Sequence, residues 1–126
     1  MADLYPVALS EWTATHTTTS STNAEATHAA ESARSHYVCG FMASVDDQAY
    51  APETGTVTLL NGTTVVFTMV IQSNSVKSYQ AGNGSALVVN FTAPVKMTEG
   101  AAVTLKVDPS GSTAASINAN VWGFTR

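Results

Sequence analysis

The chain has 126 residues, enough for one domain with a single hydrophobic core. Charged residues make up 11% of it and hydrophobic residues 44%, the opposite of the balance that keeps a chain disordered, so we expect most of it to fold. The net charge is −4 and the basic residues are scattered singly, which argues against a nucleic-acid partner. These residues are Arg34, Lys77, Lys96, Lys106 and Arg126.

No apolar stretch approaches the roughly 18 residues needed to cross a bilayer, so no membrane partner is expected. The first six residues have neither the basic region nor the apolar region of a secretory signal. Cys39 is the single cysteine, which excludes an internal disulfide. Together these features predict synthesis in a cytoplasm.

Apolar side chains occupy residues 1–12 before any strand pattern begins. Pro6 and its neighbours favour an extended path, and the segment is either a strand added to the body or an arm that docks on a neighbouring subunit. We therefore separate residues 1–12 from a single β-sandwich domain over residues 13–126. In the Thr-, Ala- and Ser-rich part that follows, alanine content favours a helix, but the alternation over residues 24–31 predicts a strand.

The β-signal strengthens from His36. Period-2 alternation over residues 36–44 divides the side chains between two faces. One face carries Tyr37, Cys39, Phe41 and Ala43, and the other His36, Val38, Gly40 and Met42. The polar residues 46–53 predict a loop after this strand.

The segment Leu60–Thr63, which contains Asn61-Gly62, stands between two runs rich in β-branched residues, 54–59 and 64–71. An Asn-Gly pair readily adopts the two positive φ angles of a type I′ turn, so this segment predicts a β-hairpin. Residues 72–85 predict an exposed connection. Further strands are expected at Leu87–Phe91, ended by Pro94, at Val103–Val107, and from about Ala115 to Thr125. Six to eight one-faced strands without a convincing helix predict an all-β fold, an antiparallel sandwich that resembles a jelly roll.

Cys39 and His36 are the residues that invite a thiol–imidazole pair. Three residues apart in one strand, they are expected on opposite faces, whereas catalysis needs them within hydrogen-bond reach. Cys39 is therefore expected to be a small buried thiol beside Tyr37 and Phe41.

His16, His28 and His36 are the three histidines, and folding could assemble them into a metal site. Their spacing lacks the short pairs that zinc sites usually show, so no metal ligand is predicted. Asp46-Asp47 lacks the further acidic and glycine positions of a calcium loop. No paired carboxylates, G-x-S-x-G elbow or phosphate loop is recognisable, so we expect no catalytic residues and no cofactor.

Several segments in a fixed order carry a resemblance to a known class of proteins. They are His36–Ser44, Gly55–Thr63, Asn90–Val95, Ala101–Leu105 and Val121–Arg126. The order resembles small virion structural proteins of tailed bacteriophages, the class that includes capsid decoration (cement) proteins and head or tail fibre modules.

The resemblance implies a non-enzymatic protein on the capsid surface that binds the major capsid protein or other virion proteins and forms a homo-oligomer, with a trimer favoured. It also implies an anchoring role for the N-terminal segment through Leu4, Tyr5, Val7, Leu9 and Trp12. The alternative is a carbohydrate-binding β-sandwich module, which stacks sugars on exposed aromatic rings. The candidate rings are Trp12, Tyr50, Tyr79 and Trp122.

Overall fold

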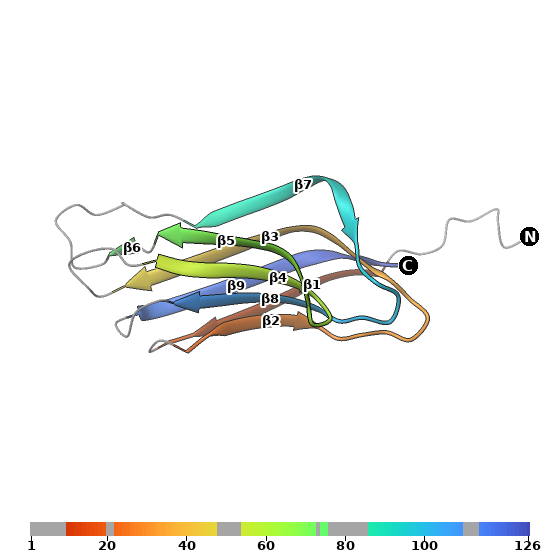
Figure 1. Cartoon of the computed structure of the whole chain (residues 1–126), viewed down its shortest axis with the longest axis horizontal. Helices are drawn as coiled ribbons and strands as arrows, with labels where there is room; N and C mark the ends of the chain where they lie inside the picture. The colour runs from red at the N-terminus through yellow and green to blue at the C-terminus, as the bar shows by residue number, and fades with distance from the viewer. Residues whose placement is uncertain (1–9, 20–21, 48–53, 73, 76–85, 110–113) are drawn as a thin grey trace, which may run out of the picture.

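The computed structural model describes residues 10–19, 22–47, 54–72, 74–75, 86–109 and 114–126 (Figure 1). Among these residues there are nine strands and no helix, so none that could cross a membrane. The strands are β1 Ser10–Thr18, β2 Ala24–His28, β3 His36–Asp47, β4 Thr54–Asn61, β5 Thr64–Gln72, β6 Asn74–Ser75, β7 Leu87–Lys96, β8 Val103–Pro109 and β9 Ala114–Thr125.

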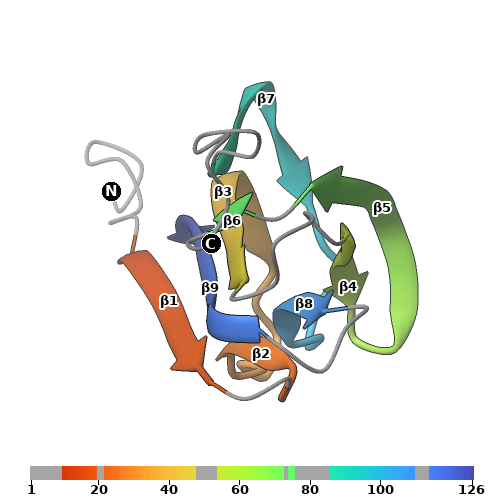
Figure 2. The ribbon, with the colours of Figure 1, turned by 90° about the vertical axis from the view of Figure 1, so that its left-hand side faces the viewer.

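The strands form two sheets that pack face to face (Figure 2). The first sheet has the order β1-β9-β3, and β3 also pairs with β7 and with the two-residue β6. The second has the order β2-β8-β4-β5. Every pairing is antiparallel except the short one between β3 and β6.

The strand pairings follow a nested order. β4 pairs with β5, β3 with β7, β2 with β8 and β1 with β9. The first half of the chain therefore pairs with the second half in reverse, as one long hairpin rolled across two sheets, which is the jelly-roll arrangement. The predicted all-β sandwich is confirmed.

The core lies between the sheets and follows strand alternation. Val103, Leu105 and Val107 of β8 are fully buried, as the sequence predicts, and they face Ile117 and Val121 of β9 and its neighbours. Burying an aliphatic side chain of this size contributes about 1.5–3 kcal/mol. The inward faces of β8 and β9 therefore hold the two sheets together.

The predicted alternation in β3 is wrong beyond Val38. The pairing of β3 with both neighbours shifts between Val38 and Gly40, which leaves Cys39 as an extra residue in the strand. Such a bulge moves every later side chain to the other face. His36 and Val38 are buried before it, and Phe41 is buried after it.

The predicted hairpin is confirmed, but its turn differs from the predicted type. Asn61 pairs with Thr64, and of the residues between them only Gly62 has a positive φ, 61°. A glycine at the first central position is typical of a type II′ turn. The Asn61 side chain instead contacts another loop, donating to Thr98 Oγ1 at 2.9 Å and accepting from Thr98 N at 3.1 Å.

Several strand boundaries also differ from the prediction. Most of the Thr-rich residues after Trp12 belong to β1. Ser10–Trp12 begin the same strand and pair with β9, which for these three residues is the added-strand alternative of the N-terminal segment. Asp46 and Asp47 end β3 and do not begin a loop. β7 continues through Pro94, since an edge strand can lose one backbone donor. The strand predicted from Ala24 is confirmed as β2.

Candidate functional site

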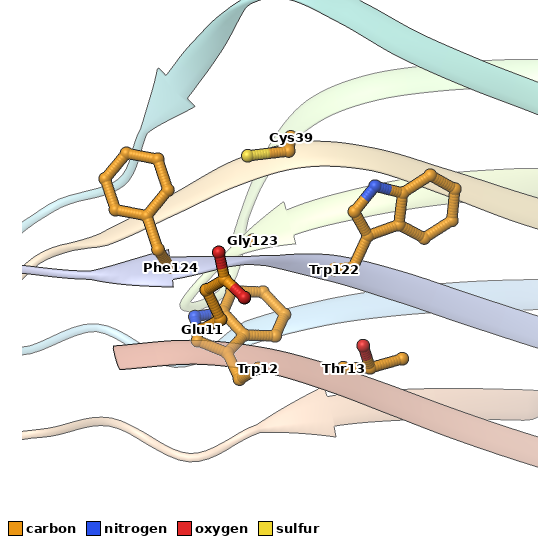
Figure 3. Close-up of a pocket in the computed structure, with 7 residues that line it drawn as sticks. All are labelled: Glu11, Trp12, Thr13, Cys39, Trp122, Gly123 and Phe124. Atoms are coloured by element: carbon orange, nitrogen blue, oxygen red, sulfur yellow. The ribbon is translucent and has the colours of Figure 1, made fainter. Parts of the chain in front are cut away.

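An open cleft lies on the outer face of the first sheet and has a volume of about 430 Å³ (Figure 3). Three neighbouring strands line it with Glu11, Trp12, Thr13, Cys39, Trp122, Gly123 and Phe124. Alternation along β9 explains the lining, because Val121 and Thr125 point into the sandwich whereas Trp122 and Phe124 point outward.

Close packing positions the aromatic rings of this cleft. A Cβ atom on Gly40 would lie 2.7 Å from Trp122 Cζ2, so glycine lets the indole pack directly on the β3 backbone. Phe124 stacks on Tyr37 with ring centroids 4.9 Å apart and planes 7° apart. The cleft therefore presents aromatic surface beside one carboxylate, Glu11, and offers a stacking platform for a flat or ring-shaped ligand.

Cys39 lines this cleft, so the prediction of a buried thiol beside Phe41 is wrong. The bulge turns Cys39 to the outer face, and Phe41 lies in the core on the other side. His36 is also buried between the sheets. The thiol and the imidazole of His36 therefore lie on opposite faces, as the sequence predicts.

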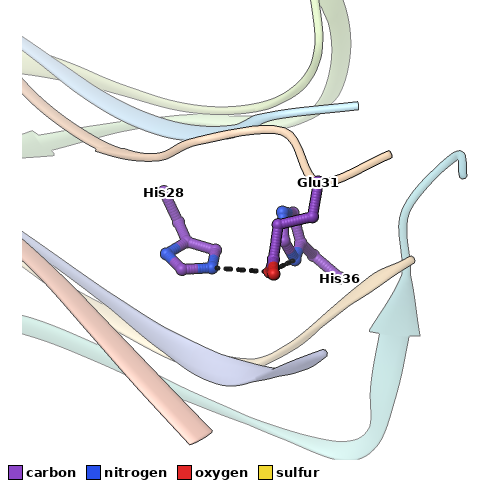
Figure 4. A group of neighbouring side chains, drawn as sticks. All are labelled: His28, Glu31 and His36. Carbon is purple, nitrogen blue, oxygen red and sulfur yellow. Dashed lines mark ion pairs between the residues drawn. The ribbon is translucent and has the colours of Figure 1, made fainter. Parts of the chain in front are cut away.

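A second cluster of polar side chains lies where β2 leads into β3 (Figure 4). It contains His28, Glu31 and His36, each with one nitrogen or oxygen atom within 4.8 Å of the others. Glu31 Oε2 lies 3.6 Å from His28 Nε2 and 3.9 Å from His36 Nδ1. The two imidazoles therefore face one carboxylate oxygen.

Hydrogen bonds determine the proton positions on His36, whose side chain is fully buried. Its Nε2 lies 2.8 Å from the carbonyl oxygen of Ala29, and its Nδ1 lies 2.7 Å from Thr125 Oγ1. A carbonyl only accepts, so Nε2 carries the proton, and in the neutral ring Nδ1 accepts from the Thr125 hydroxyl.

His28 has a different environment. Trp12 stacks on its ring with centroids 4.3 Å apart and planes 5° apart, and His28 Nε2 is buried without a hydrogen-bond partner. Burial lowers the pKa of His28, and the nearby His36 lowers it further, while Glu31 acts in the opposite direction. His28 therefore favours its neutral form.

The sequence groups His16 with these residues, but the structure does not. His16 Nδ1 accepts from the backbone N–H of Glu25 at 2.9 Å. The residue missing from the sequence analysis is Glu31, three positions after His28 and five before His36. A carboxylate at this spacing between two histidines was the sequence signal that could have predicted the cluster.

Trp12 and Trp122 both line the cleft, and neither is fully buried. The carbohydrate-binding alternative requires two candidate rings exposed on one concave face and fails if both tryptophans are buried. Of the two, Trp12 stacks on His28. Tyr50 and Tyr79 lie outside the described residues, as do Leu4, Tyr5, Val7 and Leu9 of the N-terminal segment. Tyr37 and Phe124 were not predicted as part of this surface, because they become neighbours only through the pairing of β3 with β9.

A third surface is the β5–β7 edge, formed by strands Thr64–Gln72 and Leu87–Lys96 at one side of the sandwich. Four valines there are 42–65% exposed. They are Val65, Val66, Val70 and Val88. β5 contains no charged residue, and among the described residues no strand lies beyond it in its sheet. Unprotected apolar edges of this kind pair readily with another chain.

No protein-family model matches the chain, and no curated protein matches its sequence. Among solved structures, it is similar to part of the dimeric latent PorU from Porphyromonas gingivalis, with a TM-score of 0.52 and 10% sequence identity. The match covers 94% of this chain and 13% of the PorU chain. At this identity the likeness concerns the fold alone.

Proposed function

We propose that this chain is a non-enzymatic structural protein that works by binding other protein subunits, as a capsid decoration protein on a bacteriophage virion. The β5–β7 edge carries the proposal. An exposed apolar strand without charged residues is an aggregation hazard in an isolated protein. In an assembly it becomes an interface, where backbone pairing supplies affinity and apolar side chains exclude water.

A trimer fits the positions of the two edges. β1 and β2 lie on the opposite side of the sandwich from β5 and β7 (Figure 2). A contact between the β5–β7 edge of one copy and a different surface of the next is heterologous, and such contacts close into rings when the rotation allows. Three copies around a local threefold axis of a capsid, each also touching the major capsid protein, would bury these valines.

The N-terminal segment is the proposed anchor to the capsid. Tyr5, Val7 and Leu9 alternate with Pro6 and Ala8, a period that suits addition to a sheet edge. Because Ser10–Trp12 pair with β9, the deletion that tests the anchor removes residues 2–9 and keeps β1 intact. Full occupancy of virions by the shortened chain would contradict the anchoring role.

Isolation of intact virions of the phage that encodes the chain tests the proposed function directly. We expect the protein to band with the particles in a density gradient, at a copy number that matches the capsid lattice. Its absence from intact particles would overturn the proposal. Light scattering of the purified chain tests the trimer, and a monomer at high concentration would contradict self-assembly.

Carbohydrate binding is the second candidate, and the cleft favours it. Trp122 and Phe124 present ring surface on one outer face beside the Glu11 carboxylate, which is the chemistry that holds sugar rings. Oligosaccharides released from the host cell surface should then quench tryptophan fluorescence, and Trp122→Ala should abolish the response. A wild-type chain whose fluorescence does not change would eliminate this candidate.

A further inference from the structure

We propose that His28, Glu31 and His36 bind a divalent transition-metal ion of the zinc type. The cluster lies between the two sheets where β2 leads into β3, away from the β5–β7 edge, so this inference does not depend on the proposed function. Two imidazole nitrogens and one carboxylate oxygen form a donor set that suits zinc with a fourth position left for water. Magnesium and calcium prefer oxygen ligands alone.

The distances from the Glu31 oxygen to the two imidazole nitrogens are close to those between ligands of a metal site. Metal–ligand bonds of about 2.0–2.1 Å in a tetrahedron place ligand atoms about 3.3 Å from one another. Glu31 Oε2 lies 3.6 Å from His28 Nε2 and 3.9 Å from His36 Nδ1. Glu31 is half-exposed in a turn, so its side chain can move the few tenths of an ångström that separate these distances from the spacing of a metal site.

Neighbouring polar groups orient the ligand atoms of His36 and Glu31. Histidine ligands of metals usually donate their second ring N–H to a carbonyl or carboxylate. His36 Nε2 donates to the Ala29 carbonyl in this way, so Nδ1, which lies 3.9 Å from Glu31 Oε2, is the nitrogen that keeps a lone pair. A metal at Nδ1 would replace the hydrogen bond from Thr125 Oγ1. Arg34 Nη1 lies 3.6 Å from Glu31 Oε1 and leaves Oε2 to face the imidazoles.

His28 Nε2 supplies an independent observation. Buried polar atoms nearly always have a hydrogen-bond partner, and those without one call for an explanation. His28 Nε2 is buried, has no hydrogen-bond partner and points at the Glu31 carboxylate. Stacking on Trp12 holds the ring in this orientation. A metal ion would satisfy the unpaired nitrogen.

The positions of the two histidines predict that metal binding stabilises the fold. His28 ends β2 in the second sheet, and His36 begins β3 in the first. Their connection is closed by a turn in which Arg34 N donates to Glu31 O at 3.2 Å. A metal held by both histidines would join the sheets, and it stabilises the folded chain because the unfolded chain lacks the site.

The test uses the full chain, freed of metal with EDTA and titrated with Zn²⁺ while thermal unfolding is followed by circular dichroism. We expect Zn²⁺ in molar excess to raise Tm by about 5 °C or more. Glu31→Gln and His28→Gln should each weaken binding by roughly tenfold or more. Glu25→Gln and His16→Gln are matched controls outside the cluster and should respond like the wild type.

Co²⁺ gives a second readout, because imidazole and carboxylate ligation at low coordination number produces visible absorption bands that hydrated Co²⁺ lacks. A wild-type chain with neither a Tm rise nor such bands would overturn the proposal, and so would Glu31→Gln with the wild-type response. Glu31 is half-exposed, so Glu31→Gln should fold even if His28→Gln does not, and it decides the question by itself.

Discussion

The two edges of the sandwich differ in how their side chains cover the gap between the two sheets. At the β1–β2 edge, formed by strands Ser10–Thr18 and Ala24–His28, a side chain from each sheet closes the gap, since Trp12 stacks on His28. At the β5–β7 edge, Phe67 and Phe91 both contact Phe41, but four valines remain exposed outside them.

This difference indicates which edge serves the fold and which is available for binding. Behind the β1–β2 edge, Trp12 and His28 contact the fully buried His36 of β3, whose ring nitrogens both have partners. The β5–β7 edge exposes four valines among polar side chains, and within the described part of the chain no strand pairs with the outer side of β5. Substitutions at the first should therefore reduce stability, whereas substitutions at the second should reduce association.

Trp12→Ala should have the largest effect on stability. It removes a partly buried ring that covers His28 and contacts His36, and we expect a loss of about 3 kcal/mol, the low end for truncation of a tryptophan packed against the core. Equilibrium unfolding in urea measures this loss. Trp122→Ala is the matched control on the outer face and should cost clearly less. An equal cost would mean that the β1–β2 edge is not closed by Trp12.

Thr125→Val should have an intermediate effect on stability. The change preserves the shape of a fully buried side chain but removes the hydroxyl that donates to His36 Nδ1. An unsatisfied buried acceptor costs about 1–3 kcal/mol, which urea unfolding in the presence of EDTA would detect. Thr17→Val removes an exposed hydrogen bond to Asn118 and should change stability by less than about 0.5 kcal/mol. Equal losses would contradict the special role of the buried pair.

Val70→Lys should have the smallest effect on stability and a clear effect on association. Val70 is 65% exposed, so the substitution should change the unfolding free energy by less than about 0.5 kcal/mol. A lysine protects a strand edge from pairing, so self-association measured by light scattering should decrease. Ser32→Lys places the same charge on an exposed turn outside the strands of both edges and should leave association unchanged. Wild-type association of Val70→Lys would remove the β5–β7 edge from the interface.

The hairpin was the feature most accessible from the sequence. Its residues are neighbours in the chain, so Gly62 and the flanking β-branched runs were enough to predict that the two strands pair. The same hairpin is also the tip of the rolled ribbon, which the sequence could not reveal, because the nested pairing of β1 with β9 joins residues about as far apart as the chain permits. The turn type was mispredicted because Asn61 pairs with Thr64, which makes Gly62 and Thr63, and not Asn61 and Gly62, the two central residues of the turn.

Local alternation and turn chemistry thus determined the fold class, most strand positions and the buried faces of β8 and β9, because each depends on residues a few positions apart. Tertiary structure alone decided the bulge at Cys39, which reverses the faces of β3 without any glycine or proline at that residue. It also decided the meeting of His28, Glu31 and His36, and the stacking of Tyr37 on Phe124 across β3 and β9. These arrangements depend on which strands pair and in which register, and that is set by the packing of the whole sandwich.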